Sequence, residues 1–186
     1  HLQRTLELCA AKQEMIRSYR HFGANDQVTA LASLSRALWI LGYPEQATAT
    51  AGQALAHARS MRLAFTTAFA LDGAALLGVL GADPQRAAAH ANELVSHSTE
   101  HSLADYVQRG RFIQGALLAQ GGDPQLGIEL IDNAIAETER ITNRSRRTLY
   151  LGYSATAHAS LGQPEVGLDL LDEAIQTAET LDERFF

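Results

Sequence analysis

The four prolines of the 186-residue chain recur at one constant interval of forty residues, as Pro44, Pro84, Pro124 and Pro164. A glycine lies two or three residues before each proline, and alanine or glycine lies three residues after it. Glycine readily adopts the left-handed conformation that ends a helix, and proline fits the first turn of the next helix, where no backbone N–H is needed. The interval therefore predicts four helical hairpins, each with a proline at the start of its second helix.

The helix after each proline carries an apolar stripe. The residues at the third, seventh, tenth and eleventh places after the prolines are Ala47, Ala51, Ala54, Leu55; Ala87, Ala91, Leu94, Val95; Gly127, Ile131, Ala134, Ile135; and Gly167, Leu171, Ala174, Ile175. These offsets share one face of an α-helix. We expect the small residue at the third place to let the two helices of a hairpin approach closely, and Asp83 and Asp123 to cap helix N-termini.

These signals predict helices over residues 26–41, 44–59, 63–80, 84–100, 103–120, 124–141, 145–161 and 164–180. A single hairpin cannot bury its apolar face alone, so the hairpins must stack. We expect an all-α fold, an α-α superhelix that forms one solenoid domain of four repeats: 23–61, 62–101, 102–142 and 143–181. Residues 1–22 would be an N-terminal helical cap or part of a preceding repeat, as one helix or two. Residues 182–186 would start a truncated next helix, in a fragment of a larger protein.

Composition narrows the class of function. The formal net charge of −6 argues against direct nucleic-acid binding, which normally needs a basic face. Cys9 is the only cysteine, so an intramolecular disulfide is impossible. No apolar run approaches the roughly 20 residues that cross a bilayer. We therefore expect a soluble, cytoplasmic protein that does not bind membranes.

The repeat resembles the tetratricopeptide repeat, because Leu31, Leu34, Leu38, Gly42, Ala47, Ala51, Ala54 and Leu55 fall at the spacing of that motif. It differs in its period, forty residues against about thirty-four, and in lacking the proline that usually closes the second helix. The strings SRALWILGYPEQA, GRFIQGALLAQGGDPQLGIELI, LGQPEVGLDLLDEAI and DERFF further resemble the tetratricopeptide-type region of large bacterial signalling ATPases of the AAA or STAND type.

Such ATPases often also carry a class III adenylate cyclase domain or a transcriptional-regulator domain. The resemblance implies a sensor or assembly segment of a protein of this kind. None of the catalytic motifs of that family lies in these residues, and no phosphate-binding loop, CxxC pair or HExxH motif is present. We therefore expect no catalysis by this fragment, while the parent protein could be an ATPase or an adenylate cyclase.

The first helices of stacked hairpins normally line a concave groove. The repeat positions that face such a groove hold Thr29, Ala32, Arg36, Trp39, Ile40; Ala68, Leu71, Ala75, Val79; Gln108, Arg111, Gly115, Leu118; and Leu149, Gly152, Thr156. Among them we select Arg36, Trp39, Ile40, Leu71, Gln108, Arg111 and Leu118 as candidate contacts for a partner. A small, apolar groove suits an amphipathic helix or another part of the same chain. For Trp39, a place in the core is an equal alternative.

Three histidines and a glutamate, His90, Glu93, His97 and His101, share one helical stripe. Imidazoles four residues apart can share a zinc ion. The alternative, which we favour, is a solvated flank, because the place of His97 holds only polar residues in the other repeats. We therefore expect no metal and no other cofactor. His158 occupies a place held by leucine in other hairpins, which predicts a buried or half-buried side chain.

Four arginines, Arg140, Arg144, Arg146 and Arg147, surround the turn between the third and fourth repeats. They could receive a nucleotide, an acidic peptide or another domain. The simpler interpretation, which we favour, is that Arg140 stabilises a helix C-terminus and the others are solvated. Gly115 lies inside a predicted helix, where we expect it to allow close helix packing.

Our leading hypothesis is a regulatory interaction module that binds a protein, a peptide segment or a neighbouring domain of the same chain. A small-ligand or metal sensor is the alternative, using the histidine flank or a pocket around Arg36 and Arg111. A homodimer that pairs through residues 1–20 and 181–186 is a third hypothesis. For stability, we expect Leu94→Ala to cost about 2–5 kcal/mol as a core cavity and His97→Ala less than about 0.5 kcal/mol.

Overall fold

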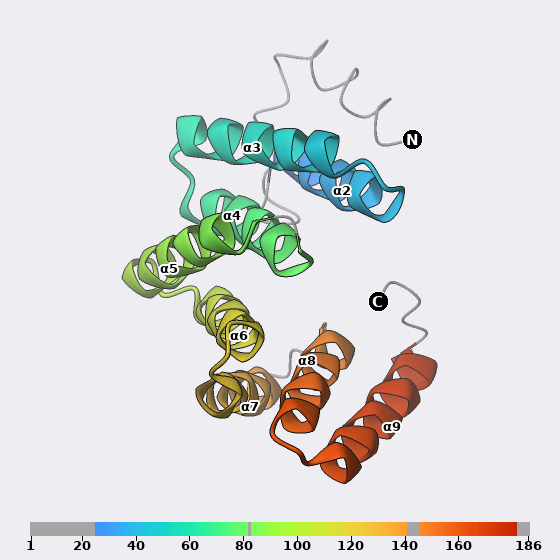
Figure 1. Cartoon of the computed structure of the whole chain (residues 1–186). Helices are drawn as coiled ribbons and strands as arrows, with labels where there is room; N and C mark the ends of the chain where they lie inside the picture. Colours follow the sequence, from blue (N-terminus) through green and yellow to red (C-terminus); the bar gives the residue numbers. More distant parts are fainter. Residues whose placement is uncertain (1–24, 82, 141–145, 182–186) are drawn as a thin grey trace. The chain divides into compact units, whose positions relative to one another are not determined.

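The computed structural model describes residues 25–81, 83–140 and 146–181. Within these ranges the chain forms eight helices and no strand. The helices are α2 (Asp26–Ile40), α3 (Pro44–Met61), α4 (Ala64–Val79), α5 (Pro84–Glu100), α6 (Ala104–Gln120), α7 (Pro124–Arg140), α8 (Arg147–Ser160) and α9 (Pro164–Leu181). Every helix end agrees with the sequence prediction within two residues. The predicted all-α fold with consecutive helices packed in pairs is confirmed (Figure 1).

The proline and glycine signals act as predicted. Each proline is the first residue of a helix, in α3, α5, α7 and α9. The preceding glycines, Gly42, Gly81, Gly122 and Gly162, have φ angles of +83°, +112°, +103° and +75°. These backbone angles favour glycine because a side chain would crowd the backbone there. A forty-residue repeat in sequence is therefore also a repeat in turn geometry.

The same hydrogen bond closes three of the four hairpin turns. In the first, the N–H of Tyr43 donates to the carbonyl of Leu38 over 2.9 Å. The matching bonds run from Asp123 to Leu118 over 2.9 Å and from Gln163 to His158 over 3.0 Å. This bond across five residues satisfies a carbonyl that the helix end would leave unpaired.

Two aspartates cap the next helices as expected. The side chain of Asp83 accepts the N–H of Arg86 over 3.0 Å, and that of Asp123 accepts the N–H of Leu126 over 3.2 Å. Each bond satisfies one of the amide donors that the first turn of a helix leaves without a helical partner. The start of α5 and of α7 is therefore determined twice, by the glycine that ends the preceding helix and by the aspartate that caps the new one.

The chain divides into two compact units, His1–Tyr106 and Val107–Phe186, and the boundary lies inside α6 and inside the predicted repeat 102–142. The expected N-terminal cap, residues 1–22, and the expected truncated helix, residues 182–186, lie outside the described residues, as does the single cysteine.

In the first unit, α4 contacts α2, α3 and α5. Its residues are therefore covered on several sides: Leu71 is completely buried among Leu31, Leu55 and Leu94 of the neighbouring helices. The rings of Phe65 and Tyr106 meet edge to face at 5.3 Å. A helix surrounded in this way is apolar on most of its faces, and α4 carries one acidic residue and no basic one.

In the second unit, α6 and α7 approach closely at glycines. A methyl group added at Gly115 would lie 2.8 Å from the carbonyl oxygen of Gly127, and one added at Gly127 would lie 2.8 Å from the backbone nitrogen of Ala119. The expectation that Gly115 serves helix packing is confirmed. Helix α8 packs on both α7 and α9, and Phe112 of α6 stacks on Tyr150 of α8 with ring centroids 4.0 Å apart.

None of the described helices combines the length and the apolar character that a membrane span requires.

Candidate functional site

A groove of about 690 Å³ lies in the second unit between α8, α9 and the C-terminal end of α6. No charged side chain is among the described residues that line it. The lining residues are Ala119 and Gln120 of α6; Thr148, Leu149, Gly152, Tyr153, Thr156, Ala157 and Ser160 of α8; and Leu171, Ala174, Ile175 and Ala178 of α9. Leu149, Gly152 and Thr156 were predicted from the repeat to face a groove, and they do line this one.

The apolar stripe of α9 is exposed where that of α7 is covered. Leu171 is 43% exposed, whereas Ile131, forty residues earlier, is completely buried. Leu168 is 62% exposed, against 6% for its counterpart Ile128. Helix α8 packs on α7, and no described helix packs on the corresponding face of α9. The last described helix thus presents to solvent a surface that the preceding repeat buries.

The polar atoms of the groove wall are largely satisfied within α8. The Thr156 hydroxyl donates to the carbonyl of Gly152 over 2.9 Å, and the Ser160 hydroxyl donates to the carbonyl of Thr156 over 3.0 Å. These bonds occupy the hydroxyl protons, so these two side chains contribute methyl groups, methylene groups and acceptor oxygens to the wall. The groove consequently offers mainly apolar contact area.

Tyr153 is the aromatic residue of the groove. Its ring meets Phe112 edge to face at 5.6 Å, which links the groove wall to the aromatic packing between α6 and α8. Burial raises the pKa of the Tyr153 phenol, since desolvation disfavours the phenolate. Near neutral pH the phenol is therefore protonated and can donate a hydrogen bond to a bound molecule.

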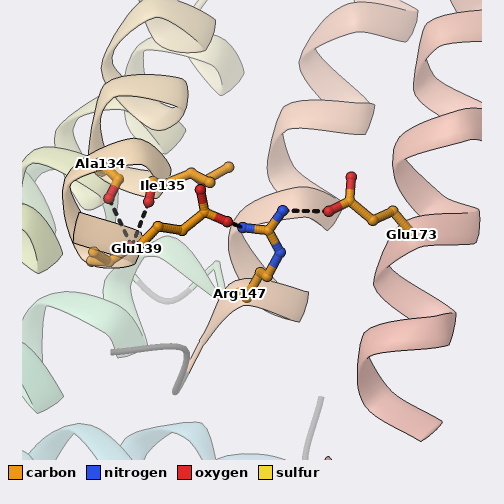
Figure 2. Close-up of polar contacts among 6 residues, drawn as sticks. Ala134, Ile135, Glu139, Arg147 and Glu173 are labelled. Atoms are coloured by element: carbon orange, nitrogen blue, oxygen red, sulfur yellow. Dashed lines mark hydrogen bonds and ion pairs between the residues drawn. The ribbon is translucent and has the colours of Figure 1, made fainter. Parts of the chain in front are cut away.

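An arginine fixes α9 in the unit. The Arg147 guanidinium, on the first turn of α8, donates to Glu139 of α7 and to Glu173 of α9 (Figure 2). Its side chain is only 19% exposed. A planar guanidinium suits such a double contact, because its donors point along fixed directions toward two carboxylates. The three helices α7, α8 and α9 are thus joined by one ion-pair network.

The predicted arginine cluster is therefore neither a free anion site at Arg147 nor simply solvated. Arg147 is engaged by two carboxylates, and Arg146 is buried. Arg140 forms an ion pair with Glu137 on its own helix at 2.9 Å. Arg144 lies outside the described residues. The expectation that the residues beyond Arg140 are solvated was wrong for Arg146 and Arg147, because α8 brings them against its neighbours.

The histidine stripe of α5 also differs from expectation. Glu93 forms an ion pair with Arg59 of α3 at 2.7 Å, and a ring nitrogen of His97, Nε2, donates to the carbonyl of Ala64 in α4 over 2.9 Å. The stripe thus contacts α3 of the preceding hairpin and α4 of its own hairpin, and the expectation of a solvated flank was wrong for His97. A nitrogen that donates a proton cannot ligate a metal at the same time.

No group of three or more histidine, cysteine or acidic side chains suited to a metal ion occurs in the described part of the chain. The rings of His97 and His101 meet at 4.5 Å. Burial lowers the pKa of His90; Glu93 partly opposes this, whereas Arg59 and Arg86 add to it. His158 is half-buried as predicted, with Nδ1 2.8 Å from the side-chain oxygen of Gln163.

The other predicted partner contacts are distributed over both units. In the first unit Arg36 and Trp39 are half-buried and Ile40 is 66% exposed. Leu71 is completely buried in the core between α2, α3, α4 and α5, so it cannot contact a partner.

The remaining predicted contacts belong to the second unit. Gln108 is buried, and its side-chain oxygen has no hydrogen-bond partner among the described residues. Arg111 is exposed and Leu118 is half-buried. None of the three lines the groove between α6, α8 and α9. The residues of α9 that do line it, Leu171 and Ile175 among them, were predicted as part of the hairpin stripe and not as contacts for a partner.

No protein-family model matches the chain, and no curated protein sequence matches it.

Proposed function

We propose that the chain is a protein-interaction module that receives a helix of a partner in the groove between α6, α8 and α9. The observation that carries this proposal is the exposed apolar stripe of α9, with Leu168, Leu171 and Ile175 between 43% and 62% exposed along one line of the helix. Spacings of three and four residues are those at which a bound helix places its own anchors.

The dimensions and chemistry of the groove agree with such an occupant. An α-helix with side chains is about 10–12 Å across, and a groove of about 690 Å³ accommodates the side chains of one face of it. The described wall residues carry no charge, and the hydroxyls of Thr156 and Ser160 are bonded within α8. Burial of apolar area would therefore supply most of the affinity, at about 25 cal/mol per Å² before the costs of association.

The wider setting that we propose follows the resemblance of the sequence. The fragment would be a tetratricopeptide-like region of a cytoplasmic bacterial signalling ATPase, of the kind that also carries an adenylate cyclase or transcriptional-regulator domain. It would perform no catalysis itself and would transmit occupancy of its groove to an attached domain. The absence of catalytic motifs from the sequence supports this division of labour.

A fluorescence-anisotropy titration tests helix binding. The probe is a labelled peptide of about 18 residues with leucines at helical spacing, and its reference is a scrambled peptide of the same composition. We expect the amphipathic peptide to bind more tightly than the scrambled one, and Leu171→Asp to abolish that preference. Leu126→Asp is the matched control, because Leu126 is 41% exposed, on α7 and outside the groove. Equal binding of both peptides to the unaltered chain would contradict the proposal.

A small-molecule sensor is a second candidate, since the groove volume falls in the range of about 300–1,000 Å³ typical of ligand pockets. The site would then be this groove with the Tyr153 hydroxyl as its donor, and not the histidine flank. Calorimetry with a panel of apolar phenols and sterols, with zinc and ATP as references, distinguishes the two candidates. A heat of binding from one of the small molecules that disappears in the Leu171→Asp variant would favour the sensor. The absence of binding heat from every compound would favour helix binding alone.

A further inference from the structure

The polar contacts between α7 and α8 show how this repeat positions a covering helix. The Ser154 hydroxyl donates to Asp132 over 3.1 Å, and Arg147 donates to Glu139. Along α8 the arginine precedes the serine by seven residues, while along α7 the aspartate precedes the glutamate by seven. The two helices therefore run antiparallel, with one polar pair near each end of the shared seam.

Helix α9 carries the same two acceptors forty residues later. Asp172 stands at the repeat position of Asp132, and Glu179 at that of Glu139. Both are exposed, and neither forms an ion pair or a side-chain hydrogen bond within the described part of the chain. The acceptors that hold α8 on α7 are thus repeated on α9, where no described residue donates to them.

These carboxylates flank an apolar stripe of α9. Leu168, Leu171, Ile175 and Ala178 follow one another at steps of three, four and three, which is the spacing of a helix-pairing seam, and the last three of them line the groove. Glu165, Asp172 and Glu179, at steps of seven, form a line beside that seam, and all three are exposed. Helix α9 contains no lysine, arginine or histidine from Pro164 to Leu181. Along α9 the charged residues beside the groove are therefore all acidic, and the α9 residues that line the groove are apolar.

We propose that α9 binds an antiparallel helix of a partner protein that carries an arginine opposite Glu179 and, seven residues later, a serine or threonine opposite Asp172. This inference rests on the proposed helix-binding function and adds the chemistry of the occupant. Charge complementarity selects a basic helix, since an acidic one would place like charges along the same edge. The apolar residues of the occupant cover Leu168, Leu171 and Ile175 as α8 covers the stripe of α7.

Two labelled peptides of about 18 residues test the inference with the full 186-residue chain. Both have the same leucine stripe and one serine; one has an arginine seven residues before the serine, and the other has glutamate there. We expect the arginine peptide to bind roughly tenfold more tightly at low salt, with a smaller ratio at 0.5 M sodium chloride. Glu179→Gln reduces the ratio, whereas Asp169→Asn, which alters an exposed carboxylate ten residues before Glu179 and so about 15 Å from it along α9, leaves it unchanged.

The outcomes separate this inference from the proposed function. If both peptides bind equally and better than a scrambled peptide, helix binding stands and the arginine-serine chemistry is wrong. If neither binds better than the scrambled peptide, both proposals are wrong. If light scattering finds a dimer of the chain that Ile175→Asp converts to a monomer, a second copy occupies the seam and the partner helix is overturned. Ile175 is already 56% exposed, so this variant should retain its fold, which circular dichroism checks.

Discussion

Gly115 provides a sharp test of the helix packing in the second unit. A methyl group added there would meet the backbone oxygen of Gly127 at 2.8 Å, and atoms of Leu130 and Ile131 at 3.0 Å. Ordinary contacts of this kind begin near 3.4 Å, so α6 and α7 would have to separate by roughly half an ångström. Since one of the obstacles is backbone, a side-chain rotation cannot relieve the contact.

Two effects of Gly115→Ala oppose each other. Alanine is favoured over glycine inside a helix by about 1 kcal/mol, while forcing extra volume into a close-packed contact typically costs about 1–3 kcal/mol. We therefore expect a net loss of about 1 kcal/mol. With a urea slope of about 2 kcal/mol per molar, the midpoint of unfolding would fall by about 0.5 M.

Urea unfolding followed by circular dichroism measures this change, and Gly152→Ala is the control. Gly152 is also in a helix of the second unit, but a methyl group there would meet nothing within 4 Å. Only the helix preference applies, so Gly152→Ala should stabilise the chain by up to about 1 kcal/mol. The two substitutions are chemically identical and should differ in sign.

The double variant Gly115→Ala/Gly127→Ala adds a coupling test. The first substitution already separates α6 from α7, so the second should cost less than it does alone. Stabilisation by Gly115→Ala as large as that by Gly152→Ala would refute the close approach of the two helices, and so would strict additivity of the two glycine substitutions.

Four further variants have outcomes that follow from the contacts and burial of the residues they alter. Leu94→Ala should lower the free energy of unfolding by about 2–5 kcal/mol, because Leu94 is completely buried in the core of the first unit. His97→Ala should lower it by about 1 kcal/mol, because it removes the hydrogen bond to Ala64; this loss is larger than the one expected from sequence. Urea unfolding measures both changes. Arg147→Ala should lose about 1–2 kcal/mol, and less in 1 M salt, since the two acidic partners are exposed enough to be hydrated. His90 has a pKa below its usual 6.5 in the folded chain, so the unfolded state binds its proton first and stability should fall as pH drops through about 6.5. Between pH 7.5 and 5.5 the melting temperature should therefore decrease less for His90→Gln than for the unaltered chain. An equal decrease in both would show that His90 is not a cause of the pH dependence.

The sequence predicted the fold well because its strongest signals are local. Proline, glycine and aspartate determine where helices begin and end through their own backbone and side-chain chemistry, as at Asp83 and Gly42. The small side chain three places after each proline predicts a close approach of two helices from its volume alone, and Gly127 does lie against α6 as expected. These effects act within a few residues and need no knowledge of which helices are neighbours.

The candidate site was predicted only in part, because exposure depends on neighbours that a repeat pattern does not specify. Leu71 and Gly152 were both predicted to face a groove, yet α4 is enclosed by three helices while α8 borders an open groove. The stripe of α9 has the same sequence pattern as the buried stripe of α7, so nothing local reveals that Leu171 is exposed. The repeat of Asp132 at Asp172 was visible in the sequence, but its meaning required the contact with Ser154.

Hydrogen exchange with mass spectrometry tests the central claim most directly. The full chain is compared with and without the amphipathic peptide that carries the arginine and the serine. We expect slower exchange in α8 and α9, over residues 148–178, and unchanged exchange in α2 to α5. Protection confined to α2 to α5, or no protection anywhere at saturating peptide, would contradict the assignment of the groove between α6, α8 and α9 as the binding surface.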